Sequence, residues 1–516
     1  MSESPQNGRD WLNRLLARVP RGGPGDVIAA NIGEGAQNVA VGKFILQNNV
    51  RIGTLVVPVR FILVLLAVAA AVAFAVWFAV VPTKMKPDTF NVAVAEFGQV
   101  DKNGQVHGSR DGSHLSRWMF GKLQAESAAL PPGVKIELWH DSQGLLHKRS
   151  TIGVIATEAQ AAQKAKEINA HMVIYGTLDA NQDPATFAPK FYVADLRAEV
   201  SEIIGGQQLG TPILFRPPVD FNDLKTGVYF EQNLQPRAEA LAWFTRGLAF
   251  DLAGQNDQAL AVFREAEQRF KNWPDDQGKE ILYVFMGREA MFLTHREREA
   301  QAVFGSVEET VAFAEGAFNQ ALTLNPAYDR AHLWLGNVYF QKAQTTLEAR
   351  QLGQAELAQV RSDLDQASHQ YREALRDAES PNSIVGVRTQ IMLGMADYLR
   401  GAAFLLTHDN ASADPLYQSA IDQIEKALPS VAQDQHRILA QTFQALGAAL
   451  FSQGYANLDN PARRNPLWDK SSIYFNQCLR QVRQDPYDAF LKDMQQYCSQ
   501  GLQELKKAKE QPGLGS

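Results

Sequence analysis

The side chains that could perform chemistry are few and widely spaced in this chain. Its 516 residues include 10 His and 2 Cys, and no Gly-x-Ser-x-Gly motif occurs. The nearest approach to a cluster is Trp139-His140-Asp141, and two histidines seven residues apart around a glycine-containing turn do not set the geometry of a metal site. We expect surface or turn histidines, no catalytic residue, no metal and no cofactor; the histidines considered are His107, His114, His140 and His147.

Gly42-Lys43 is the one segment that suggests nucleotide binding. A phosphate-binding loop requires a glycine five residues before this pair and a serine or threonine directly after it. Those positions hold Gln37 and Phe44, so both the first glycine and the Mg²⁺-binding hydroxyl are missing. We therefore reject a nucleotide site.

The two cysteines, Cys478 and Cys498, exclude a disulfide-stapled scaffold and a four-cysteine metal site. They fall on successive predicted helices, so they can be neighbours. A disulfide would suit a location outside the cytoplasm. Cys478 occupies a position where a small buried residue is expected, however, and this favours free buried thiols.

Residues 61–83 contain no charged residue and are long enough, at ~1.5 Å per residue, to cross a ~30 Å hydrocarbon layer. Arg60 precedes this run, and Lys84 and Lys86 follow it. We predict a single, uncleaved transmembrane helix, because 60 residues precede the run, which is atypical of a signal peptide. Small side chains every four residues could form a packing seam between two copies; these are Ala67, Ala71, Ala75 and Ala79.

Residues 1–60 form a basic head, with seven basic and four acidic residues and thus a net charge of +3. The chain's total of −6 therefore leaves −9 for the remainder. Basic residues near the span are slightly more numerous on its N-terminal side, which places the N-terminus in the cytoplasm and residues 84–516 outside it. Residues 9–21 predict an amphipathic helix that lies on anionic lipid or packs on a partner. A glycine-rich segment that resembles β-repeats follows, and the modest overall charge argues against a nucleic-acid partner.

Residues 88–204 alternate predicted strands and helices in the order β-α-β-α-β-β, which favours a small α/β domain with a partly parallel sheet. The helix that leads into Val173-Ile174-Tyr175-Gly176 is similar in style to the amino-terminal domain of TolB and to small domains that precede repeat arrays in bacterial envelope proteins. Small-ligand binding at the strand ends stays open as an alternative. Residues 205–236, rich in Gly and Pro, predict a linker or an extended arm.

Residues 237–508 predict an all-α solenoid of helix pairs. Large residues, glycines and alanines follow one another with regular spacing at Trp243, Gly247, Phe250, Gly254, Ala259, Phe263 and Ala266. This pattern resembles the tetratricopeptide repeat (TPR), in which small residues sit where two helices cross closely. Related positions recur four more times, a final helix over 487–508 would cap the stack, and inserts are expected near 294–310, 343–362 and 455–470.

The resemblance implies a concave face, lined by the first helix of each pair, that binds a peptide or protein surface. Its groove positions correspond here to Arg288, Arg330, Asn337, Phe340, Arg388, Tyr398, Gln444 and Phe451. Three of these are arginines within a net-acidic region, and only Asp251 opposes them, which favours an acidic or carboxylate-bearing peptide. The alternative is that they are ordinary solvated arginines.

Together these features predict a multidomain chain with one transmembrane helix, a small α/β domain and a C-terminal TPR solenoid. We expect a non-enzymatic, membrane-anchored scaffold that recruits a protein or peptide partner and that can self-associate. The alternative is a receptor-like sensor, in which the α/β domain binds a small ligand and the repeats relay the signal.

Overall fold

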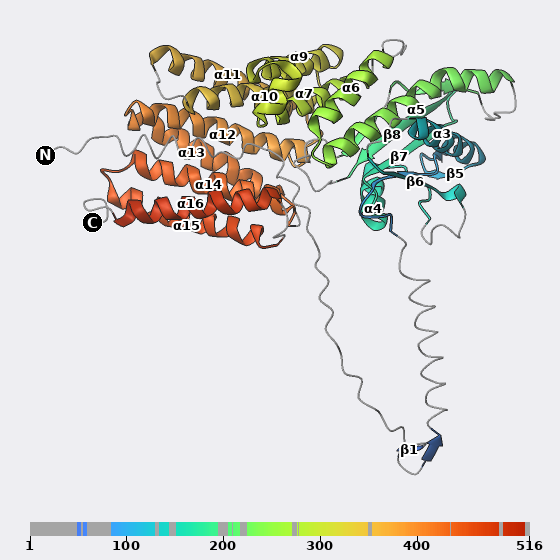
Figure 1. Cartoon of the computed structure of the whole chain (residues 1–516), viewed down its shortest axis with the longest axis horizontal. Helices are drawn as coiled ribbons and strands as arrows, with labels where there is room; N and C mark the ends of the chain where they lie inside the picture. Colours follow the sequence, from blue (N-terminus) through green and yellow to red (C-terminus); the bar gives the residue numbers. More distant parts are fainter. Residues whose placement is uncertain are drawn as a thin grey trace.

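The computed structural model describes residues 49–52, 55–58, 84–129, 134–143, 151–194, 205–208, 210–216, 224–270, 276, 278–348, 353–433, 435–484 and 489–510 (Figure 1). Four predicted features of the N-terminal part lie outside these residues: the amphipathic helix at 9–21, the glycine-rich segment at 25–47, the membrane span at 61–83 and its alanine seam. Within the described ranges, no helix has the length and apolar character of a membrane crossing. Strands β1 (Asn49–Ile52) and β2 (Leu55–Pro58) pair antiparallel.

The α/β region holds a mixed sheet in the order β10-β8-β7-β3-β6. Strand β3 pairs in parallel with β6 and β7, β8 runs antiparallel to β7, and β4, β5 and β9 lie off this path. The α/β class is therefore confirmed. The strands are β3 (Phe90–Val94), β4 (Gly98–Val100), β5 (Val106–Gly108), β6 (Ile136–His140), β7 (Met172–Asp179), β8 (Ala185–Val193), β9 (Gly205–Gln208) and β10 (Ile213–Phe215).

Both faces of the central strands are buried, because each face carries helices. Helix α3 (Arg110–Ala129) packs against β6 and α5, whereas α4 (Glu158–Ile168) packs against β7, β8 and β9. Alternate side chains accordingly enter different cores: Val92 joins the cluster that includes α3, and Ala93 joins the cluster that includes α4.

Local capping explains where several helices begin. At α4, Thr157 and Gln160 form a reciprocal capping box, in which each side chain accepts from the other residue's backbone N–H. Ser306 caps α9 by accepting from the N–H of Glu309. These caps satisfy N–H groups that have no partner within their own helix.

The prediction that residues 205–236 form a linker or an extended arm was wrong. Residues 205–208 and 213–215 add β9 and β10 to the edge of the sheet against β8, and α5 begins at Leu224 and includes Pro236. The glycines and prolines in this segment indicated a chain without regular structure. The pairing with β8 instead makes short edge strands, because the neighbouring strand supplies the hydrogen bonds.

The C-terminal region is a solenoid-like stack of helix pairs that ends in a single helix (Figure 1). The first helices of the pairs are α5 (Leu224–Leu252), α7 (Lys279–Leu293), α10 (Asp329–Glu348), α12 (Ile384–Leu406) and α14 (His436–Ala456). Their partners are α6 (Asn256–Phe270), α9 (Val307–Leu324), α11 (Gln354–Asp377), α13 (Asn410–Ala427) and α15 (Pro461–Val482), and α16 (Ala489–Glu510) follows.

Glycines fix the crossing point of each of these pairs. A Cβ added to Gly336 of α10 would lie 2.4 Å from the ring of Tyr371 on α11, and one added to Gly247 of α5 would lie 2.2 Å from Phe263 on α6. No Cβ fits at such distances, so only glycine allows the ring to pack against the facing backbone. The same relation holds for Gly287 and Phe318, Gly394 and Ile424, and Gly447 and Phe475.

The predicted inserts have three different outcomes. Residues 294–310 contain a short extra helix, α8 (Glu297–Phe304), between α7 and α9. Residues 343–362 include the end of α10 and the start of α11, so both helices are long. Residues 455–470 hold no insert, because α14 ends at Ala456 and α15 begins at Pro461.

Cys478 of α15 and Cys498 of α16 form a disulfide. The preference for free thiols was therefore wrong, although the prediction that the two cysteines are neighbours is confirmed. Both residues are fully buried within the C-terminal core. Cys478 therefore fills the position where a small buried residue was expected, and it also links α15 to the last helix. The disulfide ties α16 to the end of the stack.

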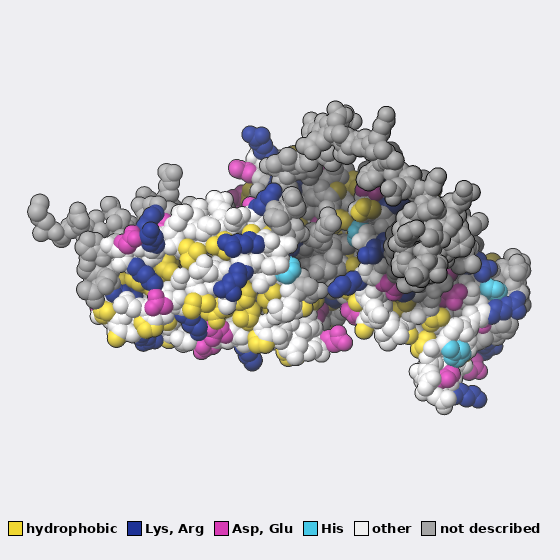
Figure 2. Space-filling view, turned by 90° about the horizontal axis from the view of Figure 1, so that it is seen from below, with side chains coloured by type: hydrophobic (Ala, Val, Ile, Leu, Met, Phe, Trp, Pro, Cys, Tyr) yellow, Lys and Arg dark blue, Asp and Glu magenta, His cyan; other side chains and the backbone are white. Residues whose placement is uncertain are grey.

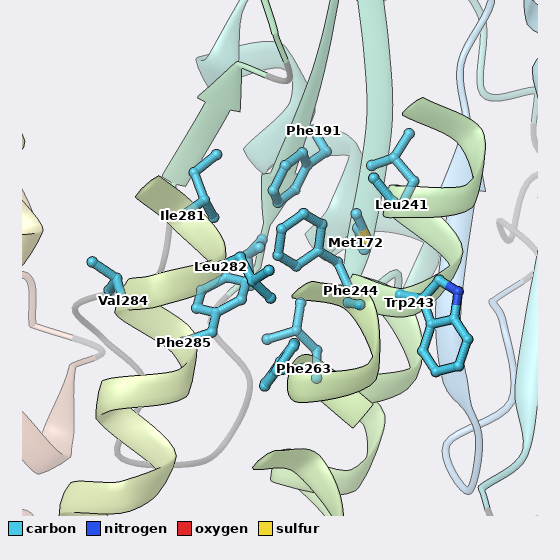
Figure 3. Packing of buried hydrophobic residues seen from close by; sticks show 14 of the residues in the cluster. Met172, Phe191, Leu241, Trp243, Phe244, Phe263, Ile281, Leu282, Val284 and Phe285 are labelled. Atoms are coloured by element: carbon cyan, nitrogen blue, oxygen red, sulfur yellow. The ribbon is translucent and has the colours of Figure 1, made fainter. Parts of the chain in front are cut away.

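The sheet and the first helix pairs share one hydrophobic core. Phe191 of β8 stacks on Phe244 of α5 with ring centroids 5.9 Å apart, and Phe244 meets Phe285 of α7 edge-on at 5.4 Å. Figure 3 shows Met172 and Phe191 pointing from the sheet toward side chains of α5, α6 and α7. The α/β region therefore closes the N-terminal end of the array, as a capping unit must in a stacked repeat protein.

Candidate functional site

Five of the eight predicted groove residues are buried between helices. Tyr398 lies against Tyr417 of α13, with ring centroids 5.8 Å apart, and Phe451 lies against Trp468 of α15, with centroids 6.1 Å apart. The pattern identified the first helices correctly, but their apparent groove positions face neighbouring helices in this stack. The expectation that these five side chains line an open groove is thus corrected; they are Arg288, Phe340, Tyr398, Gln444 and Phe451.

The other three groove residues are half-buried and have partners of their own. Asn337 accepts a hydrogen bond from the hydroxyl of Tyr371, with 2.9 Å between Oδ1 and the hydroxyl oxygen. Arg388 of α12 donates from Nη1 to Oε1 of Gln441 on α14 at 2.6 Å. Arg330, also half-buried, lies at the start of α10.

Arg330 faces the α/β region. A Cβ on Gly205 of β9 would lie 2.8 Å from Nη2 of Arg330 and 2.9 Å from Oε1 of Glu158, so both charged groups converge on the bare glycine. Next to them, the hydroxyl of Tyr328 donates to Oε1 of Gln207 at 3.1 Å. Burial raises the pKa of Tyr328 well above its usual range, so this hydroxyl remains a donor. A polar contact therefore joins β9 to the third helix pair.

Contacts between a tyrosine and a carboxylate connect successive pairs, and the sequence did not reveal them. The hydroxyl of Tyr339 on α10 donates to Oε1 of Glu315 on α9 at 2.9 Å, and Nζ of Lys342 lies 2.6 Å from Oε2 of the same carboxylate. Burial, together with this hydrogen bond, raises the pKa of Tyr339 to about 12. Tyr283 with Glu267 and Tyr474 with Glu425 repeat the arrangement.

The side of the array that carries α15 and α16 offers a large exposed surface. Seen from below, apolar side chains lie between Lys and Arg side chains along the array (Figure 2). Ile473 of α15 is 55 % exposed on this side. Ion pairs such as Lys470 with Glu425 and Lys509 with Asp469 surround this end.

His140 corrects the expectation of surface or turn histidines, because it is buried. Its Nδ1 accepts from the N–H of Ser142 at 3.0 Å, so Nε2 carries the hydrogen and faces Oγ of Ser116 at 3.2 Å. The carboxylate of Asp141 accepts from the N–H groups of Ile152 and Gly153. These contacts tie the end of β6 to neighbouring backbone. His107 is exposed, His114 is half-buried, and His147 lies outside the described residues.

Among the described residues, one group has the composition of a metal site: His332, Glu373 and Asp377. Nε2 of His332 lies 3.0 Å from the carbonyl oxygen of Pro326, which can only accept, so this nitrogen carries a hydrogen and cannot bind a metal. Arg376 pairs with both carboxylates and holds the pKa of Asp377 below its usual range. The geometry is that of an ion-pair cluster at the end of α11.

Comparisons with known proteins gave two kinds of result. No family model and no curated protein matched the chain. Among solved structures, a TPR protein of Thermus thermophilus matched 51 % of this chain and 99 % of its own length, at 15 % identity and a TM-score of 0.29. A circular tandem repeat protein matched 55 % of this chain and 75 % of its own, at 10 % identity and a TM-score of 0.24. We draw no functional conclusion from similarities at this level.

Proposed function

We propose that this chain is a membrane-anchored scaffold whose helix-pair array recruits a protein or peptide partner. The observation that carries the proposal is the array itself, a stack of helix pairs closed at one end by the sheet and at the other by α16. Its glycine-directed crossings follow the spacing that resembles the TPR family. Such stacks present an extended surface rather than a catalytic cleft.

We propose further that the partner is acidic and is bound near the starts of α10 and α12. Arg330, which converges with Glu158 on Gly205, and Arg388, which donates to Gln441, are both half-buried there, whereas Arg288 is enclosed. A guanidinium group binds a carboxylate through two parallel hydrogen bonds, so these two positions suit an acidic or C-terminal segment.

Affinity capture with the full-length chain in detergent tests this assignment. The double variant Arg330→Gln/Arg388→Gln should retain about tenfold less of the partner than wild type retains, if each arginine contributes about 0.7 kcal/mol to binding. Arg480→Gln, at an exposed position of α15, is the matched control and should retain the wild-type amount. Equal capture by all three chains would contradict the assignment.

The membrane location rests on the sequence: the uncharged run 61–83, its flanking charges and the basic head. We propose a cytoplasmic N-terminus, with the sheet and the array outside the cytoplasm, and the disulfide supports this side because such bonds persist in oxidising compartments. Cells are treated so that protease passes their outer layers while the inner membrane stays closed. Under this condition the protease should digest the C-terminal part. Digestion only after the inner membrane is broken would show the opposite orientation.

We do not carry the ligand-sensing alternative forward, since none of the described geometry favours it.

A further inference from the structure

Three ionisable side chains are buried together at the joint between the first two helix pairs. Asp251 comes from the end of α5, and Arg288 and Glu289 come from α7; each side chain is at most 3 % exposed. Nη1 of Arg288 lies 2.8 Å from Oδ2 of Asp251 and 2.7 Å from Oε1 of Glu289. Asn256, the first residue of α6, donates from Nδ2 to Oε2 of Glu289 at 2.6 Å. We call these four residues the acidic joint.

The charges in the acidic joint do not balance. Among the residues that the structure describes, the charged side chains that act on Glu289 are Asp251 and Arg288, so one guanidinium faces two carboxyl groups. Helix α6 contributes only the neutral Asn256, and α8 lies at the rim, where Arg296 donates to the carbonyl of Gly254 and pairs with Glu299. An uncompensated charge in such a site is costly, because burial removes its hydration.

A single proton would remove the excess charge. Oδ1 of Asn256 is buried and has no hydrogen-bond partner as the amide is placed. Rotating this amide by a half turn would present the oxygen to Glu289, where it could accept from a protonated carboxyl group.

We propose that the acidic joint holds one proton between Asp251 and Glu289 near neutral pH, and that losing this proton loosens the contact between the first and second helix pairs. The joint thereby makes the attachment of the sheet and the first pair to the rest of the array sensitive to pH. This inference does not depend on what the array binds.

The expected titration supports this assignment. Burial raises the pKa of Glu289 from its usual 4.5 to about 8, and the charge of Asp251 adds to the effect. Burial also raises the pKa of Asp251. A carboxyl group whose pKa is higher in the folded state stabilises the fold below its unfolded pKa, and this stabilisation is lost as the pH rises toward the folded value. Stability should therefore fall between about pH 5 and pH 8.

The variant Glu289→Gln tests the proposal, because its amide mimics a protonated carboxyl group and does not titrate. Denaturant unfolding of full-length wild type and variant is measured across this pH range, in one detergent. The unfolding constant of wild type, divided by that of the variant, should rise up to tenfold per pH unit between about pH 5 and pH 8, then level off. The exposed control Glu297→Gln should give a ratio that is constant with pH.

A flat ratio for Glu289→Gln would overturn the proposal. If this variant does not fold, Asp251→Asn removes the other acid and is compared in the same way. Infrared spectroscopy of wild type gives an independent readout: at neutral pH, the carbonyl stretch of a protonated carboxyl group should be present, since exposed Asp and Glu are ionised there. Its absence would show that both acids are ionised and would also overturn the proposal.

Discussion

At the scale of single residues, the glycines of the first helices have the clearest physical role. Gly336 is required because the ring of Tyr371 fills the space that a Cβ would occupy. Gly316, in the exposed part of α9, has no atom within 4 Å of such a Cβ. The two positions therefore separate the steric role of a glycine from its general cost in a helix.

Replacement by alanine should change the free energy of unfolding in opposite directions at these two glycines. Gly336→Ala should lower the free energy of unfolding by about 1–3 kcal/mol, because the buried ring or the helix must move. Gly316→Ala should raise it by up to ~1 kcal/mol, because alanine is the better helix former. Denaturant unfolding of the full-length chain measures both, and a stabilising Gly336→Ala would contradict the crossing described here.

At the scale of elements, the last helix depends on a covalent tie as well as on packing. The Cys478–Cys498 bridge closes a loop with a sequence separation of 20 residues. Such a loop limits the unfolded chain, which stabilises the folded one by about 3 kcal/mol in the chain-entropy description.

Replacing both cysteines by alanine should thus lower stability by about 2–4 kcal/mol and reduce the protection of α16 backbone amides from hydrogen exchange before that of α12. A reducing agent should have the same effect on wild type and none on the variant. Equal protection of α16 in both chains would mean that packing alone holds this helix.

Elements were predictable from sequence where their signal is local. The glycine and aromatic spacing of residues 243–266 indicates a helix pair because both helices of the pair are close in sequence. Strands β9 and β10 were missed because their pairing depends on β8, which no local pattern reveals. The groove positions failed for a related reason: whether a residue such as Tyr398 faces solvent depends on the side chains that pack against it, here Tyr417 of the facing helix α13, and not on its spacing along α12.

At the scale of the whole molecule, the sheet and the array form one packed body. Phe244 of α5 is fully buried and contacts Phe191 of β8, Phe263 of α6 and Phe285 of α7. The sequence pattern changes between the α/β region and the repeats, but one hydrophobic core extends across this boundary.

Phe244→Ala should consequently destabilise both regions together, by about 3–5 kcal/mol. Hydrogen exchange should show less protection in β7 and in α7, whereas a boundary between independent domains would confine the loss to α7. The buried Phe475 near the other end of the array is the matched site, and Phe475→Ala should affect α14 and α15 first.

The partner that we propose for the array would bind near the starts of α10 and α12. The most direct test places a photo-crosslinking amino acid at position 388 of the full-length chain in cells, and at the exposed position 163 of α4 as the control. Illumination should yield a protein adduct at position 388 that is absent at position 163. An adduct at position 163 alone, or the same adduct at both, would contradict recruitment by the array.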